Sequence, residues 1–208
     1  DCERRPWLWV FAAVEPRLTL FVIRQSRGCD VPQEILGVDF AGTLGIDGWA
    51  GYDQMACRKG QCAAHLLRRA AELLEVQQRG AARFPFAIQR LLLEAIAVKR
   101  SAELAPQDVA GLAEQLRGQL RLLLAGDIQE PANRRFARHL RKHEGEIFTF
   151  LDVPALEPTN NLAERELRPA VILRKLSAGY RTQSGAHVHQ ILASVGRTAT
   201  RNGLYLPT

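Results

Sequence analysis

The sequence predicts a mixed α/β protein in which short strands come first and a long helical stretch follows. Two observations support this prediction. Apolar residues in the first fifty positions form short runs rich in β-branched and aromatic side chains, which is typical of strands. From Cys62 onward, apolar residues recur every three or four positions, which is the period of an amphipathic helix. We therefore expect a small sheet and a helical block.

Three apolar runs near the N-terminus are predicted to be strands. Glu15 and Pro16 separate the first two and favour a turn, so we expect a hairpin there. All three strands are expected to build one small sheet, with a short helix between the second and the third. The strands are predicted over Trp7–Val14, Arg17–Arg24 and Gly42–Asp47, and the helix over Val31–Leu36.

The helical stretch carries four apolar stripes, separated by glycine and proline breaks. We expect the interval from Cys62 to Leu151 to be almost wholly helical, and a last helix to run from Ser184 to Asn202. The stripes are Leu66, Leu67, Ala70, Leu73 and Leu74; Ile88, Leu92, Ala95 and Ile96; Val109, Leu112, Leu116, Leu120 and Leu123; and Phe136, Leu140, Ile147 and Leu151.

Asp47 is the first of two acidic residues in an informative setting. It ends the third predicted strand, and Gly48 after it lets the backbone turn sharply away. In open α/β sheets, ligands and catalytic groups gather at the carboxyl ends of strands. An Asp-Gly pair is also an ordinary turn signal, so both interpretations stay open.

Glu164 is the second acidic residue in an informative setting. Polar residues ahead of it, from Thr159 to Asn161, predict the start of a helix with this carboxylate in the first turn. The same spacing fits a capping box, in which Glu164 only supports the helix start behind Asn161. If Asp47 and Glu164 both have a functional role and are not merely turn and capping residues, they could share a divalent metal ion.

Several segments, taken in order, resemble the transposases of the insertion-sequence-66 family, which belong to the DDE group and have a ribonuclease-H-like catalytic core. The stretch from Pro158 to Pro169 is the most specific part of this resemblance. The matching segments are Trp7–Phe11, Ser26–Gly28, Ile46–Asp53, Cys62–Arg69, Phe148–Asp152, Pro158–Pro169, Arg174–Lys175 and Ser184–Ala186.

The resemblance implies a role for each acid. Asp47 matches the second catalytic acid of the family and Glu164 the third, and both would hold Mg²⁺ or Mn²⁺ in a two-metal site. The first acid of the family lies in an Asp-Glu-Thr segment that is not visible ahead of Trp7, and Asp1 or Glu3 is a poor substitute. We therefore expect the chain to be a fragment, able to bind DNA without cutting it.

The resemblance also implies a division of the chain. Residues 1–61 would form the N-terminal part of the ribonuclease-H-like core, residues 62–151 a large helical insertion between the second and third acids, and residues 152–208 the C-terminal helices of the core.

The charge agrees with a polyanionic partner. The 208 residues carry 28 Lys and Arg against 22 Asp and Glu, a net charge of +6, and cations that neutralise phosphates release counterions on binding DNA. The expected DNA contacts are Arg165, Arg168, Arg174 and Lys175. A second basic cluster, from Arg134 to Lys142, is at least as well explained as a solvated helix face. By resemblance, the protein would assemble as a homo-oligomer on transposon ends and target DNA.

Cys62 and His65 invite a zinc interpretation together with Cys57, but a structural zinc site needs four ligands and no fourth is nearby. The resemblance offers another explanation, in which Cys62 and His65 open a helix beside the active site. The irregular spacing of the four cysteines, and the absence of a membrane-spanning or export segment, favour a reducing cytoplasm. The resemblance implies that this is the cytoplasm of a bacterium.

The sequence thus favours a DNA transposase catalytic domain. Two alternatives remain: a catalytically inactive DNA-binding remnant or accessory protein, and a related metal-dependent nuclease that cuts without strand transfer.

Overall fold

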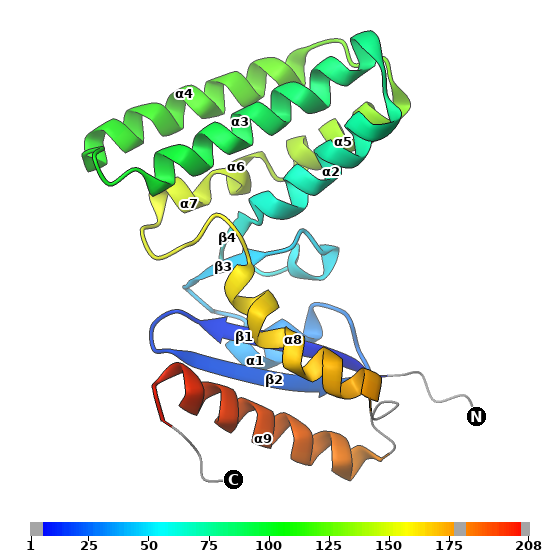
Figure 1. The fold of residues 1–208 in the computed structure, drawn as a ribbon, viewed down its shortest axis with the longest axis vertical. Coiled ribbons are helices and arrows are strands. Elements are labelled where there is room, and N and C mark those ends of the chain that lie inside the picture. The colour runs from blue at the N-terminus through cyan, green and yellow to red at the C-terminus, as the bar shows by residue number, and fades with distance from the viewer. Residues whose placement is uncertain (1–5, 177–181, 205–208) are drawn as a thin grey trace. The chain divides into compact units, whose positions relative to one another are not determined.

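The computed structural model describes residues 6–176 and 182–204, except for the side chains of Arg79 and of residues 173–176. The fold is mixed α/β, mostly helical with small sheets (Figure 1). Two compact units can be distinguished. Unit 1 comprises the described residues within 1–38, 51–55 and 161–208, and unit 2 comprises 39–50 and 56–160.

Unit 1 is built on the predicted hairpin. Strand β1 (Trp7–Ala13) pairs antiparallel with β2 (Leu18–Arg24), and helix α1 (Asp30–Leu36) follows. The alternation of side chains along a strand places Trp9 and Val22 on the face that packs against Val31 of α1. These three residues form a small apolar cluster, so the hairpin and the short helix agree with the prediction.

Two long helices complete unit 1. Helix α8 (Asn161–Leu176) packs against β1, and helix α9 (Gln183–Arg201) runs along β2 (Figure 1). The prediction for the last helix is confirmed. Its attachment is mainly polar, because side chains spaced four residues apart accept hydrogen bonds from the outer edge of β2. Thr19, Phe21 and Ile23 donate their backbone N–H groups to Thr198 Oγ1, Ser194 Oγ and Gln190 Oε1, at 2.9–3.0 Å.

Unit 2 contains the second sheet. Strand β3 (Thr43–Ile46) pairs with strand β4 (Arg58–Gln61), and the two are parallel. The prediction of one sheet from three N-terminal strands is therefore wrong: within the described chain, β3 pairs with β4 and the hairpin forms a sheet of its own. Strand β4 was missed because its sequence, Arg-Lys-Gly-Gln, has no apolar alternation to mark it.

The remainder of unit 2 is helical, as the apolar period predicted. Residues 62–151 contain no strand, and all of them are described. The elements are α2 (Ala63–Val76), α3 (Arg83–Arg100), α4 (Pro106–Ala125), α5 (Pro131–Lys142), α6 (Glu144–Ile147) and α7 (Thr149–Asp152), with a short 3-10 turn at Arg79–Ala82. Another 3-10 turn, Ala50–Tyr52, precedes β4 in the chain.

These helices bury one large apolar core. Each of the four predicted stripes contributes to it, for example through Leu66, Ile88, Leu116 and Phe136. Helices α2, α3 and α4 lie side by side in Figure 1, and consecutive members of this series are in contact. The division of the chain at residues 61 and 151 stays a prediction, because an all-helical interval does not by itself define an insertion.

Candidate functional site

Asp47 directly follows strand β3, at the carboxyl end of the β3–β4 pair. Its side chain is exposed, and its Oδ1 accepts a hydrogen bond from the backbone N–H of Trp49 at 3.0 Å. Gly48 adopts φ +85°, a conformation that glycine tolerates best. The turn therefore directs the carboxylate to solvent while one of its oxygens is held by the backbone.

The end of β4 fixes the position of this turn. Ile46, the residue before Asp47, stands opposite Gln61 in the parallel register, and its carbonyl accepts from the N–H of Cys62 at 2.8 Å. A β-carbon on Gly48 would lie 3.0 Å from Gln61 Oε1, so the turn packs directly on that amide. The predicted strand thus delivers Asp47 to a well-anchored edge.

Cys62 and His65 stand at the start of α2, as the resemblance implied. Cys62 is buried at the N-cap position, and its Sγ accepts from the N–H of Asn160 at 3.2 Å. The next residue, Ala63, donates its N–H to the Pro158 carbonyl at 2.8 Å. Cys62 and Ala63 therefore anchor the Pro158–Asn160 segment that leads into α8. Zinc gains no support, because no group of three or more metal-binding side chains occurs among the described residues.

Asn160 also lies against β3. A β-carbon added to Gly45, two positions before Asp47, would meet Asn160 Oδ1 at 3.2 Å. The glycine thus permits the close approach of the segment that precedes Glu164. Within unit 2 alone, the most specific motif of the sequence touches the strand that carries Asp47.

Glu164 lies in the first turn of α8, in unit 1, and its side chain is half-buried. Helix α8 begins at Asn161, so Glu164 is its fourth residue. In the part of the chain that the structure covers, no hydrogen bond joins Glu164 to Asn161, so the capping-box interpretation gains no support from the geometry. No ion pair engages the Glu164 carboxylate among those residues either.

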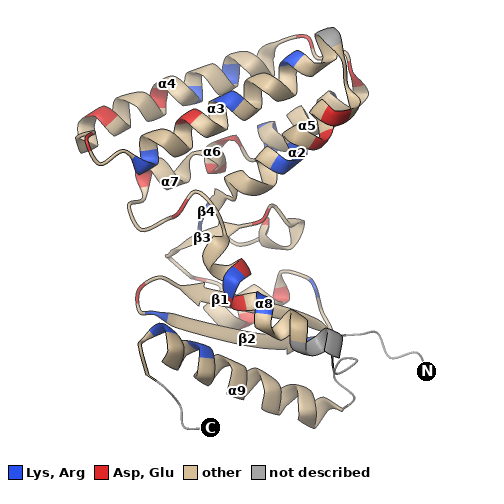
Figure 2. Ribbon diagram, in the orientation of Figure 1, with Lys and Arg blue, Asp and Glu red and all other residues tan. Residues whose placement is uncertain are grey.

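The structure describes the side chains of some basic residues of α8 but not of all of them. Arg165 and Arg168 are exposed near the start of the helix, where Figure 2 shows acidic and basic residues together. Arg174 and Lys175 lie in α8, but their side chains are outside the described residues. The second basic cluster lies on α5, where Arg134, Arg135, Arg138, Arg141 and Lys142 are all exposed, as expected for a solvated face.

Glu166, two residues after Glu164, was not singled out from the sequence. It is 1% exposed, and its carboxylate accepts from Arg197 Nε at 2.9 Å and from Arg197 Nη2 at 3.2 Å. Thr19 Oγ1 lies 3.4 Å from its Oε2. The pair ties α8 to α9 across β2. An alternating Glu-Arg-Glu-Leu-Arg sequence gave no signal that the second glutamate would be buried.

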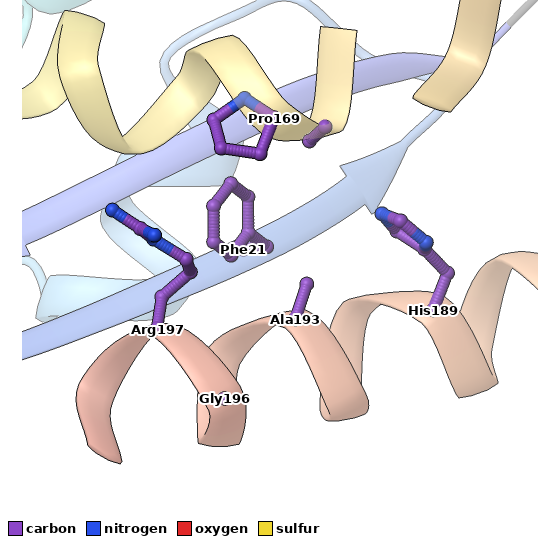
Figure 3. A pocket seen from close by; sticks show the side chains of 7 residues that line it. Phe21, Pro169, His189, Ala193, Gly196 and Arg197 are labelled. Atoms are coloured by element: carbon purple, nitrogen blue, oxygen red, sulfur yellow. The ribbon is translucent and has the colours of Figure 1, made fainter. Parts of the chain in front are cut away.

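A small apolar cavity of about 150 Å³ lies beside this pair, within unit 1 (Figure 3). Phe21 of β2 and Pro169 of α8 face it, and α9 contributes Ala193 and the aliphatic part of Arg197. Its lining is almost entirely apolar, and it holds neither candidate acid. We regard it as a packing gap between the helices and the hairpin.

Each acid by itself suits a hard divalent cation, which prefers carboxylate oxygens. Asp47 has one oxygen held by the backbone and the other unbonded among the described residues, and Glu164 is half-exposed. The donor chemistry therefore fits Mg²⁺ or Mn²⁺ at each residue. No helix in the described part of the chain is both long and apolar enough to span a membrane.

One comparison with known proteins identifies a family. The family described as "Transposase IS66 family" matches residues 2–188, which contain both Asp47 and Glu164. A relative from Sinorhizobium fredii, the uncharacterised protein y4jD, is 24% identical over 221 aligned positions. The match covers 97% of this chain and 42% of that protein, so the chain spans about two fifths of the relative's length. No solved structure matches the chain.

Proposed function

The chain belongs to the IS66 family of transposases, and we propose that it is a catalytic domain for metal-dependent DNA cleavage and strand transfer in the movement of an insertion sequence. The observation that carries the proposal is the family match across residues 2–188, a range that includes Asp47 and Glu164. We further propose that the chain folds as a ribonuclease-H-like core with a helical insertion.

Asp47 and Glu164 are the proposed metal-binding acids. Bound Mg²⁺ or Mn²⁺ would supply the Lewis acidity that activates a water or a 3′-hydroxyl and stabilises the leaving oxygen. The contribution of the chain is to present the carboxylates. The Trp49 N–H holds one oxygen of Asp47 at 3.0 Å and thereby orients the other outward. Glu164 stands in the first turn of α8 with a half-buried side chain.

DNA binding is proposed to use the cations that follow Glu164. Arg165 and Arg168 are exposed on α8, close to a proposed metal-binding residue, where a phosphodiester would need positive charge. Arg174 and Lys175 belong to the same proposal from the sequence alone. Contacts of this kind should weaken steeply with salt, because each neutralised phosphate releases a counterion.

The proposal is tested with labelled duplex DNA and the purified chain, in Mg²⁺ or Mn²⁺, by measuring DNA retention and strand cleavage in the same reactions. Retention should fall as salt rises, and the double variant Arg165→Ala, Arg168→Ala should reduce it and lower the salt slope by about two. The matched control replaces Arg134 and Arg135 on the α5 face.

The result also separates the rival functions. Cleavage and joining that are lost in both Asp47→Asn and Glu164→Gln would establish the transposase chemistry, whereas cleavage without joining would identify a nuclease. Retention without cleavage would identify a DNA-binding domain that lacks the complete catalytic set. Salt-independent retention, or retention unaffected by the α8 double variant, would contradict the proposed DNA interface.

A further inference from the structure

A connected group of polar side chains lies against the turn that carries Asp47, all within unit 2. It consists of Lys59 and Gln61 from β4, His139 from α5, His143 after it, and Glu146 from α6, and we call these five residues the polar floor. A β-carbon at Gly48 would lie 3.0 Å from Gln61 Oε1 and 3.6 Å from His139 Nε2. The backbone of the turn therefore rests on the polar floor with no space for a side chain between them.

Glu146 connects the members of the polar floor. Its Oε2 accepts from Gln61 Nε2 at 2.8 Å and lies 2.8 Å from His143 Nδ1, and its Oε1 is 3.6 Å from Lys59 Nζ. The His139 ring lies beside the His143 ring, with centroids 4.8 Å apart and planes tilted by 51°. One carboxylate thus fixes the amide that supports Gly48, and the orientation of that amide is set by the hydrogen bond to Glu146.

The burial of these groups indicates that the network has a purpose beyond packing. Gln61 is 3% exposed and His143 6%, and the side chains of Glu146 and Lys59 are 21% and 11% exposed. Burying polar and charged groups costs free energy, which an apolar cluster of the same size would avoid. A satisfied polar network instead imposes one arrangement on the backbone around it.

The apolar core already joins the helices of unit 2, whereas the polar floor ends at the Asp47–Gly48 turn. We propose that Gln61 and Glu146 are positioning residues for Asp47. They hold the Gly48 turn in place, and the turn keeps the Trp49 N–H on Asp47 Oδ1 and so sets the direction of the carboxylate. The relevance of this direction to metal binding rests on the proposed function. The helices between the two acids would then contribute to the site through α6.

The test uses two variants of the full chain, Gln61→Leu and Glu146→Gln, and one matched control, Glu144→Gln. Glu144 belongs to the same helix but pairs with Arg121 at the surface, 3.1 Å away, outside the polar floor. Amide hydrogen exchange is followed by NMR at Trp49, whose N–H donates to Asp47, and at Leu120 in the apolar core. Thermal unfolding is recorded for each variant.

In both test variants, exchange at Trp49 should accelerate by about tenfold, as expected when a local opening replaces a closed turn, while exchange at Leu120 stays unchanged. The control should match the parent chain at both positions. Unchanged exchange at Trp49 in Glu146→Gln would overturn the proposal. Glu146→Gln preserves side-chain volume, so it decides the question even if Gln61→Leu fails to fold.

Calorimetric titration with Mn²⁺ separates this proposal from the proposed function. If the parent chain binds Mn²⁺ and Asp47→Asn does not, Glu146→Gln should weaken binding by about tenfold, the size of effect seen when groups that orient a metal ligand are removed. If the parent chain itself fails to bind Mn²⁺, the metal role of Asp47 is contradicted, and the Trp49 exchange rate still decides whether the polar floor holds the turn.

Discussion

The two units of this transposase-family chain are stabilised by different forces. Unit 2 buries one large apolar core drawn from all of its longer helices. The apolar cluster of unit 1 is smaller: among the described residues its buried members are Trp9, Val22 and Val31. Unit 1 depends instead on directional contacts: the α9 side chains on the β2 edge, and the buried Glu166–Arg197 pair. Each proposed acid is therefore supported in a different way, Asp47 by a packed helical unit and Glu164 by directional polar contacts.

The difference also appears in the surface of α9. Its charged residues, Arg197 and Arg201, lie toward its C-terminal end (Figure 2), and both bond to other parts of unit 1. Arg201 donates to the carbonyls of Ala13 at 2.7 Å and of Leu18 at 2.6 Å, where the two strands meet the hairpin turn. Cations that elsewhere suggest DNA contact are structural here.

The largest effect should come from the apolar core of unit 2. Phe136 is fully buried, so Phe136→Ala should lower the free energy of unfolding of unit 2 by about 3–5 kcal/mol. Phe86, which is 52% exposed, supplies the control, and Phe86→Ala should change it by less than about 1 kcal/mol. Amide exchange in α3 measures both. Similar values for the two variants would mean that the apolar core does not stabilise unit 2 as described.

In unit 1, the corresponding test is the buried ion pair. Glu166→Gln should lower the free energy of unfolding by about 2 kcal/mol, because a hydrogen bond to a charged group is lost and Arg197 keeps its charge without its partner. Glu164→Gln, on the same helix, should cost less than about 0.5 kcal/mol. Urea unfolding compares the two variants. A larger cost for Glu164→Gln would give that residue a structural role and weaken its proposed metal role.

The attachment of α9 should be more modest in energy. Ser194→Ala leaves the Phe21 N–H without its hydrogen-bond acceptor at a buried edge, which should cost about 1–2 kcal/mol. Amide exchange at Phe21 should accelerate accordingly. Ser184→Ala, at an exposed position of α9, serves as the control and should leave Phe21 unchanged. Equal exchange in the two variants would show that α9 does not protect the strand edge.

The smallest effect concerns an exposed pair in unit 1. Arg24 holds the pKa of Glu34 below its ordinary value of 4.5 through a side-chain hydrogen bond, and the two side chains are 2.6 Å apart. A lowered carboxyl pKa stabilises the folded state above the unfolded pKa, and this contribution is lost as pH falls through the folded pKa. Glu34→Gln should therefore be slightly destabilising at pH 7, and in urea titrations the difference should shrink as pH falls below 4.5 and through the lowered pKa of Glu34. A difference that does not shrink on acidification would exclude this ion pair as its cause.

The sequence predicted the apolar part of the structure better than the polar part. Periodicity predicted the helical stripes and the hairpin, because burying apolar side chains such as Leu116 and Phe136 removes their surface from water. Strand β4 could not be predicted from periodicity, because Lys59 and Gln61 are placed by pairing with β3 and by the Glu146 carboxylate. No local pattern announces partners 85 residues apart, as in the bond between Gln61 and Glu146.

The candidate site shows the same division. The settings of Asp47 at a strand end and of Glu164 in the first turn of a helix were both predicted from neighbouring residues, and both are confirmed. Their shared role rests on family membership, and it stays a proposal. Glu166 was missed because its burial depends on Arg197, which comes from another helix.

The claim that Asp47 and Glu164 are metal-binding acids is tested by paramagnetic broadening of amide signals in a Mn²⁺ titration. We expect selective broadening at Gly48 and Trp49 in unit 2 and around Arg165 in unit 1. Asp47→Asn should remove the broadening in unit 2, and Glu164→Gln should remove the broadening in unit 1. Loss of the broadening at both positions in either single variant would indicate that the two acids share one ion. Amides near both acids that stay sharp while Mn²⁺ broadens other regions would contradict the claim.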